Sequence, residues 1–172
     1  MNEDFSGYYN EYYRTREEID GICKRLNDIH VHHLQCKKGC CKCCLPFSIL
    51  PVEFHAIREE LASLNISFLN IRNKKKCIFL QDGLCTIYNY RPIICRTHGL
   101  PLLYVNEDDN WELYVCDLNF TRVNLETFTD ENTFPQDLYN SKMYMLNQEF
   151  IRHYSKKNYS ERQLVPVKNI PV

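Results

Sequence analysis

Three features that would place the sequence in a common class of protein are missing from it. No apolar run approaches the ~18 residues of a membrane-spanning helix, so no membrane association is expected. The net charge of −1 over 172 residues supplies no excess of positive charge for nucleic acid. No glycine-rich loop follows a strand pattern, so no site for a nucleotide or S-adenosylmethionine is predicted.

No secretory leader is expected either, because residues 1–9 are acidic and polar rather than basic and then apolar. We therefore expect a cytoplasmic protein in a reducing compartment. Hydrophobic residues make up 44 % of the 172 residues and charged residues 25 %, which is typical of one globular domain covering 1–172. Ten cysteines in a reducing compartment favour metal or redox chemistry over structural disulfides.

Half of these cysteines lie in one short segment, C-K-K-G-C-C-K-C-C, from Cys36 to Cys44. Cys36, Cys40 and Cys43 have the spacing C-x3-C-x2-C, in which short turns bring successive sulfurs toward one point. Gly39 can adopt a positive φ next to a ligand. Cys44 follows Cys43 directly, and neighbouring side chains point apart, so Cys44 should serve a second centre or bridge two ions.

The charges around this segment agree with metal binding. Lys37, Lys38 and Lys42 are interleaved with the thiols, and no acidic residue occurs from Cys36 to Val52. We expect these lysines to lower the thiol pKa values and to offset the surplus charge of four thiolates on one divalent ion. The alternatives are a disulfide knot or a lysine-rich loop of inert cysteines, and the missing leader argues against the first.

Helical periodicity flanks the cysteine region. Residues 2–34 predict one helix or two, with an apolar face formed by residues three or four apart: Tyr9, Tyr13, Arg16, Ile19, Ile22 and Leu26. A second helix is predicted to begin at Pro51, and a final helix to span about 135–154 behind a capping box of Thr133 and Gln136. The tail, 155–172, is expected to be extended over the surface or loose.

Some single side chains near these helices could take part in chemistry. Cys23 is interpreted as a small buried hydrophobe. Glu53 complements the dipole of the second helix, and His55 is expected at the surface. The histidines that precede the cluster are interpreted as solvent-facing or capping residues rather than ligands: His30, His32 and His33.

Two β-hairpins are predicted between the helices. Asp82-Gly83 predicts a two-residue turn in which Leu80 faces Cys85, which puts Cys77 on the other side of the ladder unless it lies outside the ladder or a bulge intervenes. A second hairpin covers about 100–119 and ends near Cys116. The fold class is therefore predicted as helix-rich α+β, a small irregular metal-stabilised domain with a cysteine core at about 36–119.

The segment R-P-I-I-C-R places Cys95 behind Arg91-Pro92, a break in the chain. Its neighbours Arg96 and His98 are candidate hydrogen-bond donors to sulfur. Lys42 and Arg91 complete the set of residues expected to surround the ligands.

These segments carry a resemblance to a known family. The chain resembles the YkgJ-type cysteine-cluster proteins, also described as CxxCxxCC or zinc- or iron-chelating domains. The resemblance is carried by the cysteine cluster, by C-I-F-L with C-T-I-Y, by R-P-I-I-C-R and by a last cysteine. The resemblance implies zinc or iron held by eight cysteines: Cys36, Cys40, Cys43, Cys44, Cys77, Cys85, Cys95 and Cys116. A related region in flagellin lysine N-methylases, associated with an iron–sulfur cluster, adds a 4Fe-4S centre to the candidates. The first spacing is three residues rather than two, and Cys41 is additional.

The function predicted from the residues and the resemblance is thiolate metal binding, with a structural, sensory or electron-transferring role and no assigned catalytic residue. Two four-thiolate sets and one shared polynuclear centre both remain open. The chain is expected not to be an enzyme, because a closed four-thiolate site offers no open coordination position. The alternatives are an accessory or catalytic component of a protein-modification system for methyl transfer or maturation, with an unknown protein partner, and a metal-delivery chaperone. A radical enzyme and a thiol–disulfide oxidoreductase are disfavoured, because the strand–helix repeats that they need are missing.

Overall fold

The fold, seen in a computed structural model that describes residues 4–64 and 76–170, is built from helices joined by short strands. The α-helices of this part of the chain are α1 Ser6–Ile29, α2 Pro51–Ser63, α3 Ile93–Thr97 and α4 Gln136–His153. The strands are β1 Ser48–Ile49, β2 Leu80–Gln81, β3 Leu84–Cys85, β4 Leu102–Val105, β5 Trp111–Tyr114, β6 Phe134–Pro135 and β7 Val165–Pro166. The predicted helix-rich α+β class is confirmed.

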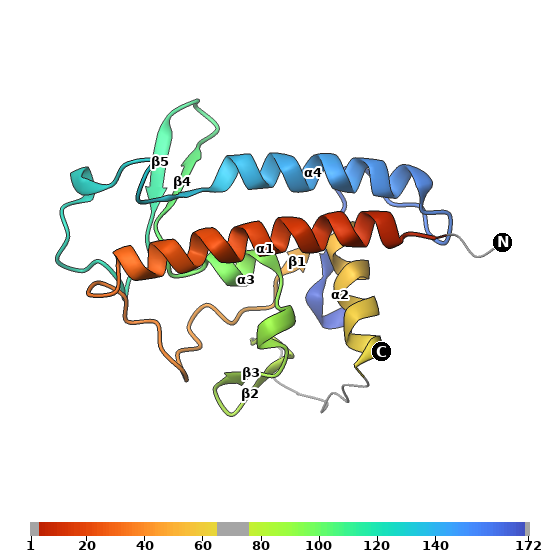
Figure 1. The fold of residues 1–172 in the computed structure, drawn as a ribbon, viewed down its shortest axis with the longest axis horizontal. Coiled ribbons are helices and arrows are strands. Elements are labelled where there is room, and N and C mark those ends of the chain that lie inside the picture. Colours follow the sequence, from red (N-terminus) through yellow and green to blue (C-terminus); the bar gives the residue numbers. More distant parts are fainter. Residues whose placement is uncertain (1–3, 65–75, 171–172) are drawn as a thin grey trace.

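The two long helices, α1 and α4, run antiparallel and side by side along the molecule (Figure 1). α1 is a single helix whose first turn is held by the Asp4 carboxylate, which accepts a hydrogen bond from the Ser6 amide at 2.9 Å. It ends at Ile29 rather than at residue 34, because a turn follows in which the His33 amide donates to the His30 carbonyl oxygen. The predicted start at residue 2 lies outside the described residues.

The buried face of α1 is rotated slightly from the predicted one. It consists of Tyr12, Thr15, Ile19, Cys23 and Leu26. The interpretation of Cys23 as a buried hydrophobe is confirmed, since only 6 % of its surface is exposed. The face is rotated because α1 packs against α2, α3 and α4, and it therefore buries a wider stripe than contact with one neighbour would produce.

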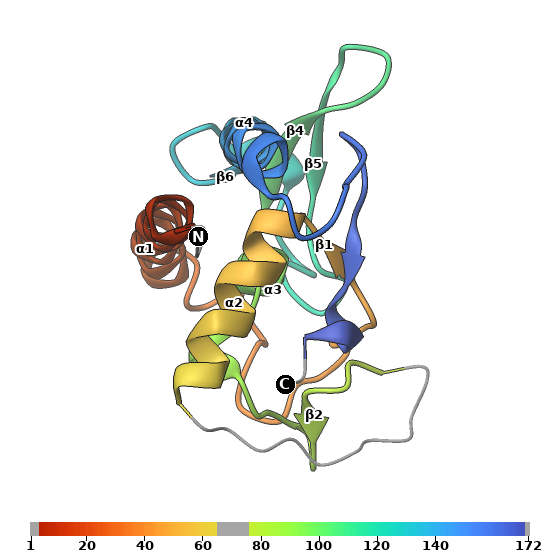
Figure 2. The same ribbon diagram turned by 90° about the vertical axis from the view of Figure 1, so that its right-hand side faces the viewer.

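α2 begins at Pro51, as predicted, and crosses the molecule between α1 and the C-terminal strand (Figure 2). Its first two turns are buried on every side, because α1 and α4 both pack against them. The prediction that His55 lies at the surface is therefore wrong. His55 is 8 % exposed, and its Nε2 lies 2.9 Å from the hydroxyl of Tyr159.

The first predicted hairpin is confirmed in its turn and in its register. Asp82 and Gly83 both have positive φ, 49° and 78°, as a two-residue hairpin turn of the primed type requires. Leu80 pairs with Cys85. Cys77 lies before the two-residue strand β2, outside the ladder, which meets the condition under which Cys77 and Cys85 can share a site.

The second predicted hairpin is also confirmed, and its first strand has an additional partner. β4 pairs with β5 in antiparallel fashion, with Leu102 opposite Tyr114 and Val105 opposite Trp111. On its other edge β4 pairs with β6 in parallel. This arrangement places Cys116, two residues after β5, at the base of the hairpin.

Two predictions at the C-terminal end are wrong. The tail is not loose on the surface, because Val165 pairs with Ile49 of β1 and Ile170 is fully buried in the core. Thr133 does not cap α4, whose N-cap is Pro135, and the Thr133 hydroxyl donates to the Thr129 carbonyl oxygen at 2.7 Å instead. The predicted helix itself is confirmed at 136–153, and its buried residues include Tyr139, Met143, Leu146 and Phe150.

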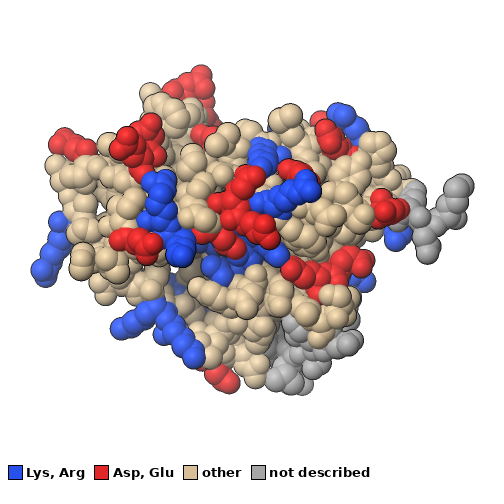
Figure 3. Space-filling model, viewed as in Figure 1, with Lys and Arg blue, Asp and Glu red and all other residues tan. Residues whose placement is uncertain are grey.

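Charged side chains of both signs are interspersed over the face shown in Figure 3. Several of them pair across helices, as in the contact of Lys142 on α4 with Glu18 on α1 at 2.8 Å. Among the described residues, no helix has the length and apolar character needed to cross a bilayer.

Candidate metal centre

The cluster segment folds as two consecutive tight turns. In the first, the Cys40 amide donates to the Lys37 carbonyl oxygen at 2.9 Å, and Gly39 adopts the positive φ of 94° that such a turn needs. In the second, the Cys44 amide donates to the Cys41 carbonyl oxygen at 3.2 Å. The short turns expected from the C-x3-C-x2-C spacing are therefore present. All ten cysteines of the chain are free thiols, which leaves no disulfide knot.

A first pocket gathers four of the predicted ligands. Cys36, Cys40 and Cys43 from the cluster line it together with Cys116 from the end of the β4–β5 hairpin. The thiols are close enough to influence one another: burial raises the pKa of Cys43, and the thiols of Cys36, Cys40 and Cys116 raise it further. We call these four residues the first set.

A second pocket gathers three more. Cys77 before β2, Cys85 on β3 and Cys95 on α3 line it together with apolar side chains. The remaining predicted ligand, Cys44, adjoins this pocket, since its carbonyl oxygen accepts a hydrogen bond from the Cys77 amide at 3.1 Å. Burial raises the pKa of the Cys44 thiol to about 12, and the neighbouring thiols of Cys43, Cys85 and Cys77 contribute to this shift. We call Cys44, Cys77, Cys85 and Cys95 the second set.

The turn of the β2–β3 hairpin lies against the cluster. A Cβ built on Gly83 would stand 3.7 Å from the carbonyl oxygen of Gly39, in ordinary van der Waals contact. This proximity shows that the hairpin that carries Cys85 lies beside the turn between Cys36 and Cys40. The two pockets are therefore neighbours in one part of the molecule.

The extra cysteine of the cluster, Cys41, is half-buried, and neither pocket includes it. Its carbonyl oxygen accepts a hydrogen bond from the Lys76 ammonium group at 3.2 Å. Its thiol contributes to the raised pKa of Cys44, and its omission from the predicted ligands stays a prediction.

Cys36 has polar and steric support that the sequence did not reveal. Asn119, which is 2 % exposed, donates from Nδ2 to the Cys36 Sγ at 3.3 Å and to the Gly99 carbonyl oxygen at 2.7 Å. Its Oδ1 accepts from the amide of Gln35 at 2.7 Å. Gly99 has a φ of 96°, and a Cβ there would stand 2.7 Å from the Cys36 Sγ. No pattern in the sequence indicated Asn119.

Four residues were predicted to surround the ligands: Lys42, Arg91, Arg96 and His98. Three of them line the two pockets. Lys42 and His98 line the first pocket, with Tyr114. Arg91 lines the second, and its Nε donates to the Cys95 carbonyl oxygen at 3.3 Å.

Arg96 does not act as the predicted donor to sulfur, because its hydrogen bonds within the described part of the chain go to oxygen atoms. They reach the Asp20 carboxylate and the carbonyl oxygens of Arg91 and Asn89.

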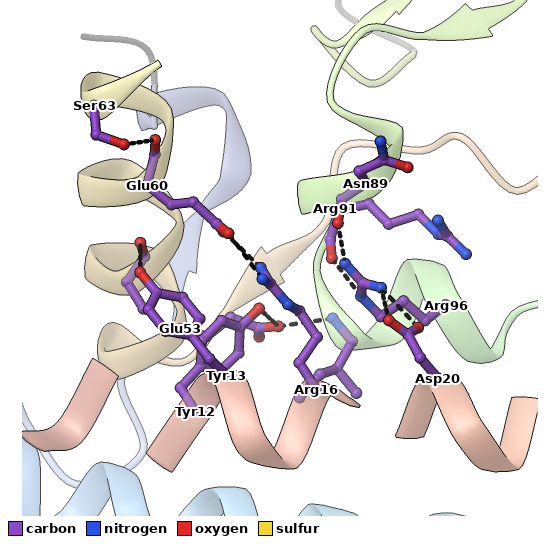
Figure 4. Close-up of polar contacts among 12 residues, drawn as sticks. Tyr12, Tyr13, Arg16, Asp20, Glu53, Glu60, Ser63, Asn89, Arg91 and Arg96 are labelled. Atoms are coloured by element: carbon purple, nitrogen blue, oxygen red, sulfur yellow. Dashed lines mark hydrogen bonds and ion pairs between the residues drawn. The ribbon is translucent and has the colours of Figure 1, made fainter. Parts of the chain in front are cut away.

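Arg96 and Glu53 instead fix the short helix α3, which carries Cys95 (Figure 4). The buried Glu53 carboxylate accepts hydrogen bonds from the Ile93 amide at 2.7 Å and from the Tyr12 hydroxyl at 3.3 Å. Glu53 was predicted only to complement the dipole of the second helix. Its carboxylate also links α1, α2 and α3. Burial raises the pKa of Glu53 to about 7.

Burial determines the direction of the thiol pKa shifts. It is the largest influence at Cys36, Cys43, Cys77, Cys85 and Cys95, and each of these pKa values lies above that of an ordinary thiol. The expected lowering by lysine is wrong. Lys37, Lys38 and Lys42 are exposed, and water screens their charge.

Of the histidines before the cluster, His32 and His33 are exposed, as predicted. His30 is buried, and its Nε2 lies 2.6 Å from the carbonyl oxygen of Asn132. His30 therefore fixes the loop that precedes β6.

The thiols line the pockets without converging on one point. Among residues 4–64 and 76–170, no three Cys, His, Asp or Glu side chains stand close enough together to hold an ion. In small metal sites the ligands commonly gather as the ion binds, because binding and local folding are coupled. The donor type nevertheless fits, since sets of four thiols suit zinc and iron alike.

The CxxCxxCC domain, described as "Putative zinc- or iron-chelating domain", is found at residues 35–117. This range contains all eight predicted ligands, and the match supports metal binding by this part of the chain. No curated protein and no solved structure matches the chain.

Proposed function

We propose that this protein binds two ions of zinc or iron, one through the first set and one through the second. The observation that supports the proposal is the division of seven of the eight cysteines between two neighbouring pockets, with Cys44 adjoining the second. Cys116 lies with the three spaced thiols of the cluster in the first set. Cys44 lies with the three thiols that follow the cluster in the sequence, Cys77, Cys85 and Cys95. Each set draws its members from distant parts of the sequence.

The chemistry of such a site is that of an ion enclosed by soft donors. Four thiolates leave no open position for water or substrate, which argues against metal-assisted hydrolysis and favours a structural, sensory or electron-transferring role. The protein contributes the surroundings: Asn119 orients the Cys36 thiol, and Arg91 holds the backbone at Cys95.

The adjacency of Cys43 and Cys44 supports one further form of the proposal, a single polynuclear centre. The thiol of Cys43 contributes to the raised pKa of Cys95 in the second set, so the two sets are in electrostatic contact. An iron–sulfur cluster or two thiolate-bridged ions would use this proximity.

Metal analysis of protein purified without oxygen tests the proposal. We expect about two equivalents of zinc or iron per chain if each set binds one ion. A colourless protein with zinc excludes iron–sulfur, whereas a brown protein with acid-labile sulfide supports it. A metal content of about one equivalent or less under these conditions contradicts the proposal.

Single cysteine-to-serine variants test the assignment of the sets. Cys43→Ser and Cys85→Ser should each lose about one equivalent of metal, because each removes one thiolate from a different set. Cys41→Ser is the matched control, since it alters the same segment and should retain the full content. A loss at Cys41→Ser as large as at Cys43→Ser would overturn the ligand assignment.

A further inference from the structure

The two sets differ in their access to solvent. Cys36 and Cys43 of the first set are exposed, whereas every member of the second set is at least partly buried. An incoming ligand can therefore reach the first set directly.

The walls of the two pockets differ as well. Lys42, His98 and Tyr114 line the first, and half of the Tyr114 surface is exposed. The second is walled mostly by apolar side chains, of which Phe79, Ile87 and Val167 are almost fully buried, and Arg91 is the charged residue in its lining. Metal exchange requires a competing ligand to approach the ion, and an apolar wall keeps both water and ligand out.

The backbone that carries the first set is also more exposed than the helix that carries Cys95 of the second set. Three thiols of the first set belong to the turns of the cluster, whose residues are mostly exposed. In the second set, Cys95 lies on α3, which Glu53 and the ion pair of the buried Arg96 with the partly exposed Asp20 fix to α2 and α1. Release of an ion from the second set would disturb the packed core, whereas release from the first would disturb turns at the surface.

We propose that the first set is an exchangeable metal site and that the second set retains its ion as part of the folded core. This inference rests on the proposed function and adds a division of labour to it. The ion in the first set is then cargo or signal. A partner that takes it must present soft donors of its own, thiolate or imidazole.

Competition with a coloured chelator tests the division on the full chain loaded with zinc. We expect two phases of equal amplitude, with the first at least about tenfold faster, which equals about 1.4 kcal/mol in activation free energy. A single phase that removes all the zinc overturns the inference. Failure to load two equivalents of zinc instead counts against the proposed function, so the two failures are distinguishable.

Alkylation with iodoacetamide after the first phase identifies the emptied set in the unmodified protein. Mass spectrometry should find the label on Cys36, Cys40, Cys43 and Cys116, with Cys44, Cys77, Cys85 and Cys95 protected. Label on the second set at this stage overturns the inference. Cys36→Ser should abolish the fast phase and leave the slow one, and Cys41→Ser should leave both phases unchanged.

Discussion

Asn119 donates a hydrogen bond to the Sγ of Cys36 across 3.3 Å, although 83 positions separate the two residues. The same side chain accepts a hydrogen bond from the amide of Gln35 and donates one to the carbonyl oxygen of Gly99. One buried amide thus fixes the first residue of the cluster against the end of the β4–β5 hairpin.

Asn119→Asp should weaken metal binding by the first set about 10- to 100-fold, the usual cost of losing a group that orients a ligand. The aspartate keeps the acceptor for the Gln35 amide, but it places a negative charge against the Cys36 sulfur. Competitive zinc titration measures the loss. Asn140→Asp is the control, because Asn140 is exposed on α4 and only accepts from Gln136. Equal zinc affinity in the two variants would contradict the role of Asn119.

Gly99→Ala should lower the free energy of unfolding by about 1–3 kcal/mol and impair the first set. The added methyl group would meet the Cys36 Sγ at 2.7 Å, on a backbone whose φ of 96° is strained for alanine. Gly21→Ala is the control. Among the described residues, and apart from the neighbouring backbone of α1, no atom lies within 4 Å of a Cβ at Gly21, so alanine there should stabilise by about 0.5–1 kcal/mol. Thermal unfolding and zinc content check both variants, and an unchanged Gly99→Ala protein would refute the prediction.

Glu53→Gln should change how stability depends on pH. The pKa of Glu53 is raised to about 7 from 4.5, so the folded state binds the proton more tightly than the unfolded state. This contribution is fully present below about pH 4.5 and is lost as pH rises through 7, with a total of up to about 3 kcal/mol. Glutamine cannot ionise and should remove that loss while keeping an acceptor for the Ile93 amide.

Urea unfolding of both proteins between pH 4 and 8 measures this effect as the difference between variant and wild type at each pH. The subtraction is needed because His55, whose pKa is lowered to about 4 by burial, acts in the opposite direction. It destabilises the fold as pH falls from 6.5. A pH-independent difference between Glu53→Gln and wild type would show that Glu53 titrates normally.

Ile170→Ala should destabilise the protein by about 2–5 kcal/mol, as expected when a large buried side chain leaves a cavity. Ile170 is fully buried, whereas Leu164 in the same segment is 51 % exposed. Leu164→Ala should therefore stay within about 0.5 kcal/mol of wild type. If chemical denaturation gave both variants the same small effect, the tail would not be part of the core.

The parts of the fold that local sequence determines could be predicted. Asp82 and Gly83 dictate a turn type, and the turn dictates that Leu80 faces Cys85. Pro51 marks the start of α2 in the same way. α3 was not predicted, because five residues are too few to show a helical period.

The parts that depend on distant contacts could not be predicted. The parallel pairing of β4 with β6 and the pairing of β1 with β7 involve two residues per strand, which leaves no alternation to detect. His55 and the tail were misplaced for the same reason, since helices and strands from elsewhere in the chain cover them. The cysteine pattern predicted eight ligands, but only tertiary structure shows that Cys116 lies with the cluster and Cys44 with Cys77.

The wall of the second pocket is completed by Val167, next to the strand that pairs with β1. During translation, Cys44, Cys77, Cys85 and Cys95 leave the ribosome well before Val167 is added. The pocket therefore lacks one side while the nascent chain grows. An ion destined for this pocket has its easiest entry in that interval, so the metal supply during synthesis, rather than afterwards, should determine which element the mature core contains.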